Sequence, residues 1–443
     1  MSARAALPLV LAAAATLPGI YLGVTGAEPA PPIAAAIYGT AIIGAAFVLS
    51  WVAEAVQVDI SAGLAIGLLA LIAVLPEYAV DFVFTIQGGE DFAAYGPSCV
   101  APDAPPGTES SCGLALANMT GANRILVGVG WSMVVLLAAW RVHRNRIQEG
   151  STRSARAPKD TSVALNRTDA VPLTFLAVAT LYSLTLPLRQ SITFVDTAIL
   201  VGIFVLYTIR VARAPAGDPD LAGASAWIGE MPKTRRRLTC GGLFAFAAIV
   251  ILLVAENFAH ALVSTGTSLG VSQFLLVQWV APLASEAPEL LVAGLYAWRL
   301  KTTDALATLI SSKVNQWTLL VGTLPIVFAI ASKSASGLPI DALQREELLL
   351  TAAQSLFAVS LLLSLSITVR GALSLLGLFM AQFVLATVLP ESVQGIELLV
   401  LSGVYLLLAV VNFVRQRDQL VVLVRDGVRT PYRDLADQRN ASE

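Results

Sequence analysis

The sequence predicts an all-α polytopic membrane protein made of two inverted five-helix repeats, with about one extra transmembrane helix at each end. Its composition, its apolar segments and a recurring motif support this prediction. Of 443 residues, 56% are hydrophobic and 13% are charged, and the mean hydropathy is +0.75. A soluble domain carries roughly 25% charged residues. The composition therefore indicates that a lipid bilayer surrounds the chain, and no basic domain predicts a nucleic-acid partner.

Twelve apolar segments approach the length of about 20 residues that a membrane-spanning helix needs. They cover residues 6–26, 33–56, 62–87, 113–140, 170–188, 193–212, 238–262, 272–298, 305–332, 347–369, 372–389 and 395–414. The first segment also fits a signal peptide, because Arg4 precedes the apolar run and Ala27 lies near a potential cleavage point. Both interpretations of this segment stay open.

Positive charges gather in the loops that follow the even-numbered segments. The richest loops are residues 141–167 and 213–237, and Arg299, Arg370 and Arg415 follow later even-numbered segments. Loops rich in Lys and Arg stay on the cytoplasmic side. We therefore expect an integral protein of the bacterial inner membrane with both termini in the cytoplasm.

Cys99 and Cys112 lie in a polar, Pro- and Gly-rich stretch that this topology places outside the cell, where a disulfide can persist. We expect them to be bonded. A histidine-based metal site is not expected, because the chain has only His143 and His260 and no C-x-x-C motif. No cofactor is expected.

One order of motifs occurs twice along the chain. Val52-Ala53-Glu54 precedes Leu75-Pro76-Glu77 and Asn123, and Val254-Ala255-Glu256 precedes Ala287-Pro288-Glu289 and Asn315. By the predicted topology, the helix with Glu77 runs outward and the helix with Glu289 runs inward. Inverted repeats of this kind are common in secondary transporters, whose sites lie near mid-membrane on broken helices.

The domain organisation follows from the repeat. Residues 33–212 form the first repeat, 213–237 a cytoplasmic linker and 238–389 the second repeat. Residues 1–32 add a transmembrane segment before the repeats, and 390–443 add a segment and a cytoplasmic tail after them.

Four acidic residues, Glu77, Asp81, Glu286 and Glu289, fall inside predicted spans. Such a group costs about 2.5–3.5 kcal/mol at mid-membrane, so a chain rarely keeps several without a use. Asp81 lies one turn after Glu77, and Glu286 precedes Glu289 by a turn, which puts each pair on one helix face. Their oxygens suit Na⁺, Ca²⁺ or a proton. Stabilising a bent helix by hydrogen bonds is the structural alternative.

At these residues the chain resembles the cation/calcium exchanger superfamily, the sodium/calcium exchanger-like membrane proteins. Each signature repeat of that family reads roughly G-T-S-x-P-E and then G-N-x-x-G-S-N. The corresponding residues here are 73–77 and 117–123 in the first repeat, and 285–289 and 310–315 in the second. The likeness covers residues 33–389 in architecture and four short segments in motif.

The resemblance implies a secondary antiporter that exchanges Na⁺, Ca²⁺ or another cation against Na⁺ or H⁺ by alternating access. Glu77 and Glu289 would face each other and bind the cation, with Asp81 and Glu286 close by. Oxygens from other motif residues would complete the shell, namely Asn118, Asn123, Ser285 and Asn315.

Three departures from the family pattern change the expected site. Ala73 and Val74 replace hydroxyl residues, Glu286 replaces another, and Lys313 stands where the family has Gly. A buried ammonium needs a carboxylate partner. We therefore expect Lys313 to lie within ion-pair reach of Glu286 or Glu289 and to take the place of one bound cation. This favours proton coupling.

Two other classes of protein remain as alternatives: an intramembrane carboxylate-based enzyme, and a channel or non-transporting scaffold. An enzyme is disfavoured because Asp81 has no matched catalytic aspartate in the sequence pattern. The expected partners are the transported cations and the lipid bilayer. The sequence leaves open the identity of the ions and the oligomeric state.

Overall fold

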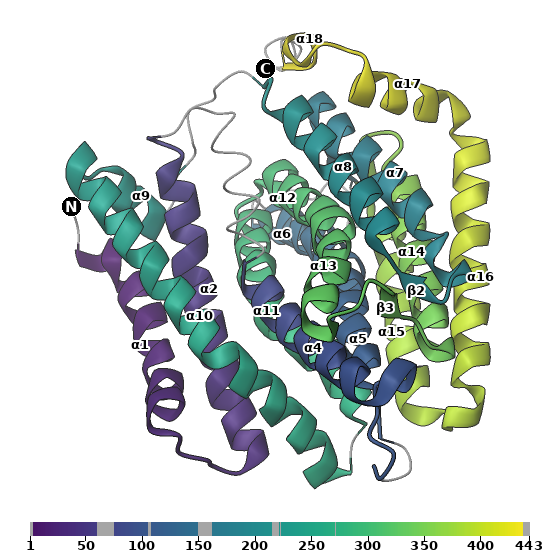
Figure 1. Ribbon diagram of the computed structural model, residues 1–443. Coiled ribbons are helices and arrows are strands. Elements are labelled where there is room, and N and C mark those ends of the chain that lie inside the picture. Colours follow the sequence, from purple (N-terminus) through teal and green to yellow (C-terminus); the bar gives the residue numbers. More distant parts are fainter. Residues whose placement is uncertain are drawn as a thin grey trace.

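The computed structural model describes residues 3–59, 75–104, 108–148, 162–214, 221, 223–270 and 272–436. Helices make up nearly all of this part of the chain (Figure 1). The longer ones are α1 Ala3–Thr25, α2 Pro31–Val56, α4 Leu75–Tyr95, α5 Ser111–Ile125, α6 Ser132–Gln148, α7 Ala170–Ser183, α8 Phe194–Val211, α10 Lys233–Leu269, α11 Gln273–Trp298, α12 Thr302–Asn315, α13 Val321–Ser332, α14 Ala342–Leu361, α15 Val369–Val388 and α16 Glu391–Arg415.

Among the described residues, nine helices are long and apolar enough to cross a membrane. A tenth candidate is α11, whose parts Gln273–Ala287 and Glu289–Trp298 are bent by 58°. This bend falls at Pro288, which lacks the N–H that a continuous helix uses. The other two predicted spans correspond to α4, whose predicted first half lies outside the described residues, and to α14, which begins with a polar turn.

Three of the long helices, α1, α2 and α10, form a layer beside the rest of the molecule (Figure 1). We call this layer the wing. Glycines allow its helices to approach closely, because a Cβ atom at Gly44 of α2 would meet the carbonyl oxygen of Ala12 in α1. The short helix α9, Ala224–Gly229, packs against α2. The remaining helices form the core, in which α5 is buried along its whole length.

Two short antiparallel ladders show how the repeats are related. β1 (Ser162–Ala164) precedes α7 and pairs with β4 (Ser366–Thr368), which precedes α15. β2 (Ser191–Ile192) precedes α8 and pairs with β3 (Leu338–Pro339), which comes before α14. Exchanging the repeats converts one ladder into the other. The small ladders are the only departure from an all-helical fold in the described part of the chain.

In both repeats, the helix widens shortly after its asparagine motif. A π-helical turn covers Leu126–Trp131 between α5 and α6, and a second covers Gln316–Leu320 between α12 and α13. Such turns are frequently found at functional sites. Their matching positions place the two asparagine motifs next to equivalent irregularities.

The expected disulfide is confirmed: Cys99 and Cys112 are bonded, with their Cα atoms 5.8 Å apart. Cys112 begins α5, so the bond ties the preceding loop to a core helix. Both cysteines are buried although the loop itself is polar.

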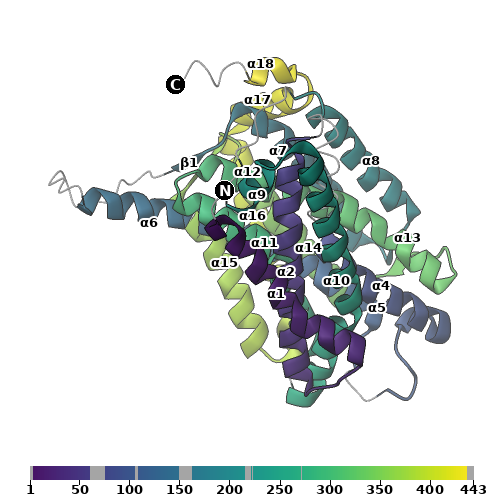
Figure 2. The ribbon, with the colours of Figure 1, turned by 90° about the vertical axis from the view of Figure 1, so that its left-hand side faces the viewer.

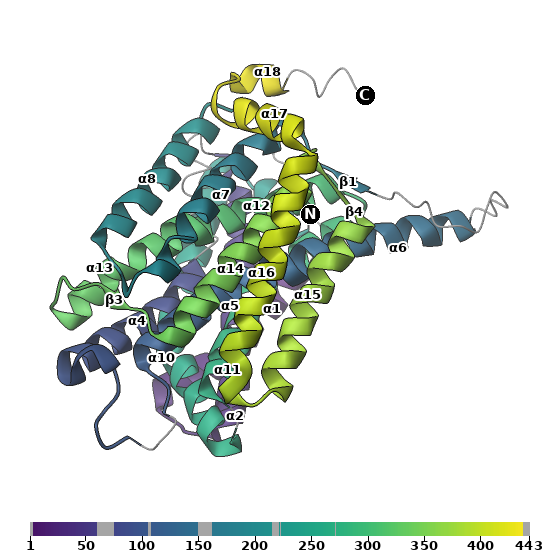
Figure 3. The same ribbon diagram turned by 90° about the vertical axis from the view of Figure 1, so that its right-hand side faces the viewer.

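The C-terminal segment folds back across the core (Figure 3). Helix α17, Arg417–Val428, packs on α7, and the short α18, Tyr432–Ala436, follows it. Asp426 of α17 accepts two hydrogen bonds from Arg167, at 2.6 and 3.0 Å. Figure 2 shows that α6 instead projects away from the body of the molecule.

Candidate cation site

The predicted acidic residues meet between the two repeats. Gln316 lies at the centre and donates hydrogen bonds to Glu286 Oε1 at 2.8 Å and to Glu77 Oε2 at 3.4 Å. Glu77 and Glu286 are 2% and 3% exposed, respectively, and Gln316 bridges their carboxyl groups. Across the repeats, Gln316 thus joins Glu77 to Glu286, and Glu289 acts on them electrostatically.

Asp81 and Asn118 form a second pair within the first repeat. The Asn118 amide donates to Asp81 Oδ1, and both side chains are fully buried. Asp81 lies one helical turn beyond Glu77 on α4, as the spacing predicts, so it continues the polar face of that helix. The hydrogen bond joins α4 to α5 at the depth of the acidic group.

The expected contact of Lys313 with Glu286 or Glu289 is wrong. Its ammonium group instead donates to the backbone oxygen of Asn123 and to Asn123 Oδ1, the latter at 2.7 Å. No ion pair within 4 Å joins Lys313 to either glutamate among the described residues. Gln316 already donates to Glu286, and two oxygens of Asn123 satisfy the ammonium. The Lys313 charge still acts on Glu77 and Glu286 from a distance.

The other predicted ligands divide into two groups. Ser285 directs its hydroxyl to carbonyl oxygens of its own helix, at Ala281 and Pro282, and so does not point into the acidic group. Asn315 keeps its Oδ1 atom free of hydrogen bonds within the described chain. Ala73 and Val74, where the family carries hydroxyls, lie outside the described residues.

Several buried oxygens near this centre accept no hydrogen bond from the described residues. They are Glu77 Oε1, Asp81 Oδ2, Asn118 Oδ1, Glu286 Oε2, Glu289 Oε2 and Asn315 Oδ1. Free oxygens of this kind are what a hard cation requires. In the described part of the chain, however, no three acidic, histidine or cysteine side chains converge closely enough to hold a metal ion.

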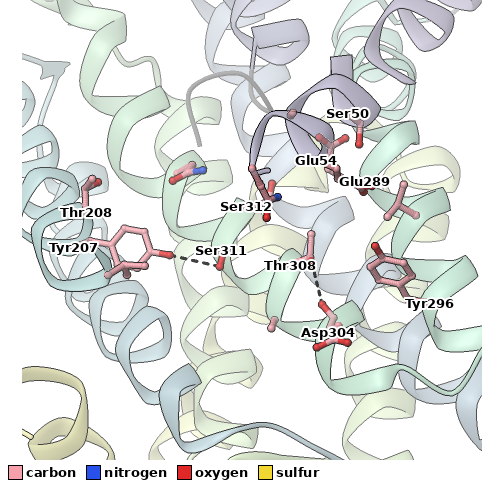
Figure 4. Close-up of a pocket in the computed structure, with 16 residues that line it drawn as sticks. Ser50, Glu54, Tyr207, Thr208, Glu289, Tyr296, Asp304, Thr308, Ser311 and Ser312 are labelled. Carbon is pink, nitrogen blue, oxygen red and sulfur yellow. Dashed lines mark hydrogen bonds between the residues drawn. The ribbon is translucent and has the colours of Figure 1, made fainter. Parts of the chain in front are cut away.

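A cleft of about 520 Å³ leads to this centre between the wing and the core. Figure 4 shows Glu54 of α2 and Glu289 of α11 on one side of it and Tyr207 of α8 on the other, with Ser311 between them. Asn315 also lines the cleft. Glu54 Oε2 accepts a hydrogen bond of 2.5 Å from Ser225 of α9. The cleft therefore gives ions a route to Glu289 and Asn315.

A family model described as sodium/calcium exchanger protein matches residues 32–212 and 240–414, which is most of the chain. The chain belongs to the sodium/calcium exchanger family. It is accordingly a cation antiporter and not an enzyme, and the function expected from the repeats is confirmed at this level.

Solved structures support the same assignment. The crystal structure of the H⁺/Ca²⁺ exchanger CAX is 33% identical to this exchanger over 98% of this chain and 99% of that one, with a TM-score of 0.84. The structure of native YfkE is 15% identical over 84% and 97% of the two chains, with a TM-score of 0.57, and shows the shared fold. Among curated proteins no match was found.

Two residues of the exchanger's polar interior were not predicted as part of a site. Gln316 and Arg124 each directly follow the asparagine that ends a repeat motif, Asn315 and Asn123. Arg124 is fully buried and forms an ion pair with Glu347 of α14. Their shared position after the motif asparagine is the signal that would have identified both.

Proposed function

We propose that this exchanger moves Ca²⁺ across the membrane in exchange for protons. The contact of Glu77 with Glu286 through Gln316, beside the charge of Lys313, carries the proposal. Carboxyl groups that crowd together in a buried site favour binding a cation or a proton over remaining as bare anions. Such a group can therefore release protons when Ca²⁺ binds. The similarity to the H⁺/Ca²⁺ exchanger CAX supports this choice of ions.

In this proposal Glu77, Glu286 and Glu289 bind the cation directly, and Asn315 and Asn118 add amide oxygens. Asp81 holds Asn118 in place. Asn123 positions Lys313, which supplies a fixed positive charge where a family member without it would need another ion. Ser285 stabilises the bent helix α11 through its own carbonyl contacts and is not a ligand.

The cleft lies at the cytoplasmic side in the proposed topology, with both termini in the cytoplasm. The C-terminal end of α2 and the N-terminal end of α12 line it, and both ends are cytoplasmic under the positive-inside rule. We assign 33–212 and 238–389 as the repeats, 213–237 as the linker, and 1–32 and 390–443 as the flanking segments. The wing would move against the core to close this cleft and open the other side.

Transport into proteoliposomes tests the function. Vesicles with an imposed pH gradient should accumulate Ca²⁺, and Glu77→Gln or Glu289→Gln should reduce the initial rate at least 100-fold. Glu256→Gln is the matched control, because Glu256 lies in the membrane on α10 with its side chain 74% exposed, and it should keep the wild-type rate. Accumulation driven by a Na⁺ gradient and insensitive to pH would replace proton coupling with sodium coupling. No Ca²⁺ flux under either gradient would refute the proposal.

A further inference from the structure

A second group of charged residues lies buried in the exchanger, outside the cation site. Arg124 of α5 and Glu347 of α14 form an ion pair whose side chains are 0% and 4% exposed. Glu397 of α16 is 7% exposed and interacts electrostatically with both. We call these three residues the Arg124 cluster. It joins α5 to α14 and α16, and none of its residues lines the cleft.

The Arg124 cluster would carry a net negative charge if all three of its side chains were ionised. Arg124 carries one positive charge, whereas Glu347 and Glu397 would carry two negative charges if both were ionised. Arg124 is fixed in position by Trp279, whose ring centre lies 5.3 Å from the guanidinium carbon, and Gln354 donates to its backbone oxygen. One cation thus faces two carboxyl groups in an apolar surrounding.

No donor in the described chain compensates for the second negative charge. Neither Glu397 Oε1 nor Glu397 Oε2 has a hydrogen-bond partner among the described residues. Lys313 acts electrostatically on Arg124, but its ammonium group already donates to two oxygens of the cation site and not to Glu397. Two further titratable groups border the cluster, Glu346 on α14 and Tyr405 on α16. Neither supplies a positive charge. An ionised carboxylate in this position would be strongly unfavourable.

We propose that the Arg124 cluster is a second intramembrane proton-binding site, in which Glu347 and Glu397 hold one proton between them. A proton fits better than a metal cation, because it needs only one oxygen and no coordination shell. The proton is separate from those exchanged at Glu77, Glu286 and Glu289. Arg124 directly follows Asn123, which binds Lys313 of the cation site. The second site is therefore linked to the cation site through adjacent residues of α5.

The charge count makes a specific prediction for neutralised variants. In Glu397→Gln, Glu347 remains to balance Arg124, and in Glu347→Gln, Glu397 takes over that role. Either change replaces the bound proton with a neutral amide. Both single variants should therefore fold and each should lack one protonated carboxyl group, whereas the double variant leaves Arg124 unpaired and should not yield folded protein.

Infrared spectroscopy of the purified full chain without transported cations measures this directly. The C=O stretching band of protonated carboxyl groups should lose the intensity of a single group in Glu397→Gln and in Glu347→Gln, relative to wild type. Glu346→Gln is the matched control, with the same chemical change one residue away and outside the buried cluster, and it should retain the full band.

An unchanged band in a folded Glu397→Gln variant overturns the proposal, even if Glu347→Gln does not fold. A band lost in Glu77→Gln but intact in Glu397→Gln assigns the proton to the cation site instead. The measurement involves no ion flux, so its result is independent of the proposed Ca²⁺/H⁺ exchange. Failed transport with the expected spectra would refute only that exchange.

Discussion

Lys313 illustrates how a single residue sets the charge of the exchanger's site. Its position corresponds in the first repeat to Gly121, where a Cβ atom would collide with the backbone of Gln278. One repeat thus keeps a glycine that permits close packing of α5 and α11, whereas the other extends an ammonium group across to Asn123. The inverted repeats are therefore symmetric in backbone and asymmetric in charge.

Lys313→Gln should keep a donor for Asn123 and remove the positive charge. The nearby carboxyl groups would then bind protons more tightly, so protons would compete with Ca²⁺ at higher pH. We expect the pH of half-maximal Ca²⁺ uptake to rise by about one unit, a size that corresponds to roughly 1.4 kcal/mol of lost interaction. Lys313→Arg is the control that retains the charge. Identical pH profiles in wild type and Lys313→Gln would mean that Lys313 has only a structural role.

For individual residues, the sequence could identify the acidic side chains of the site but not the groups that bind to them. Glu77 and Glu289 followed from the repeated Pro-Glu motif, and Asp81 and Glu286 from helical spacing. The partner of Lys313 did not follow, because a backbone oxygen of Asn123 is available only where α12 meets α5. Gln316 was missed because its signal, a position directly after the motif asparagine, appears only when the two repeats are aligned through Asn123 and Asn315.

Among the helices, α14 departs from its predicted bounds at both ends. The sequence placed a span at 347–369, whereas the helix runs Ala342–Leu361 and a turn and β4 follow it. The polar start looked like a loop because it contains Arg345, Glu346 and Glu347. Glu347 is buried against Arg124 of another helix, a contact at long sequence distance that hydropathy along the chain cannot reveal.

Helix α17 depends on one buried carboxylate for its attachment to α7. Hydrogen bonds from Arg167 lower the pKa of Asp426, although burial opposes this shift. Because the folded pKa lies below the unfolded value, the attachment is stabilised above the unfolded pKa and lost as pH falls through the folded one. We expect α17 to resist proteolysis at neutral pH and to become cleavable below about pH 4, the ordinary range of an aspartate.

Asp426→Asn should make α17 cleavable at neutral pH as well, through a loss of about 1–2 kcal/mol for a partly screened charged hydrogen bond. Asp418→Asn on the same helix is the control, since its side chain is 98% exposed. Equal protease resistance in the two variants would show that the Asp426 carboxylate is not needed, and that apolar contacts and the backbone hydrogen bonds from Thr174 and Arg210 hold α17.

For the whole molecule, the disulfide provides a test of the proposed topology. A membrane-impermeant maleimide added to intact cells should label Cys99 and Cys112 only after reduction, because the bond occupies both thiols. Cys99→Ser/Cys112→Ser should remain unlabelled, since the remaining Cys240 lies near the start of α10, at the cytoplasmic side in the proposed topology. Labelling before reduction would contradict the bond in cells. Labelling only in permeabilised cells would show that the loop with Cys99 and Cys112 faces the cytoplasm, opposite to the proposed topology.

The paired strands also govern the order in which the chain can mature. β1 and β2 emerge from the ribosome with the first repeat, but their partners β4 and β3 belong to the second. Neither half can satisfy its own strand edges, so the first must wait, partly unpaired, until residues 338–368 have been synthesised. Two fragments divided within 213–237 should therefore survive when co-expressed and be degraded when expressed singly. The two repeats therefore depend on each other for folding, as the subunits of an obligate dimer do, although they belong to one chain.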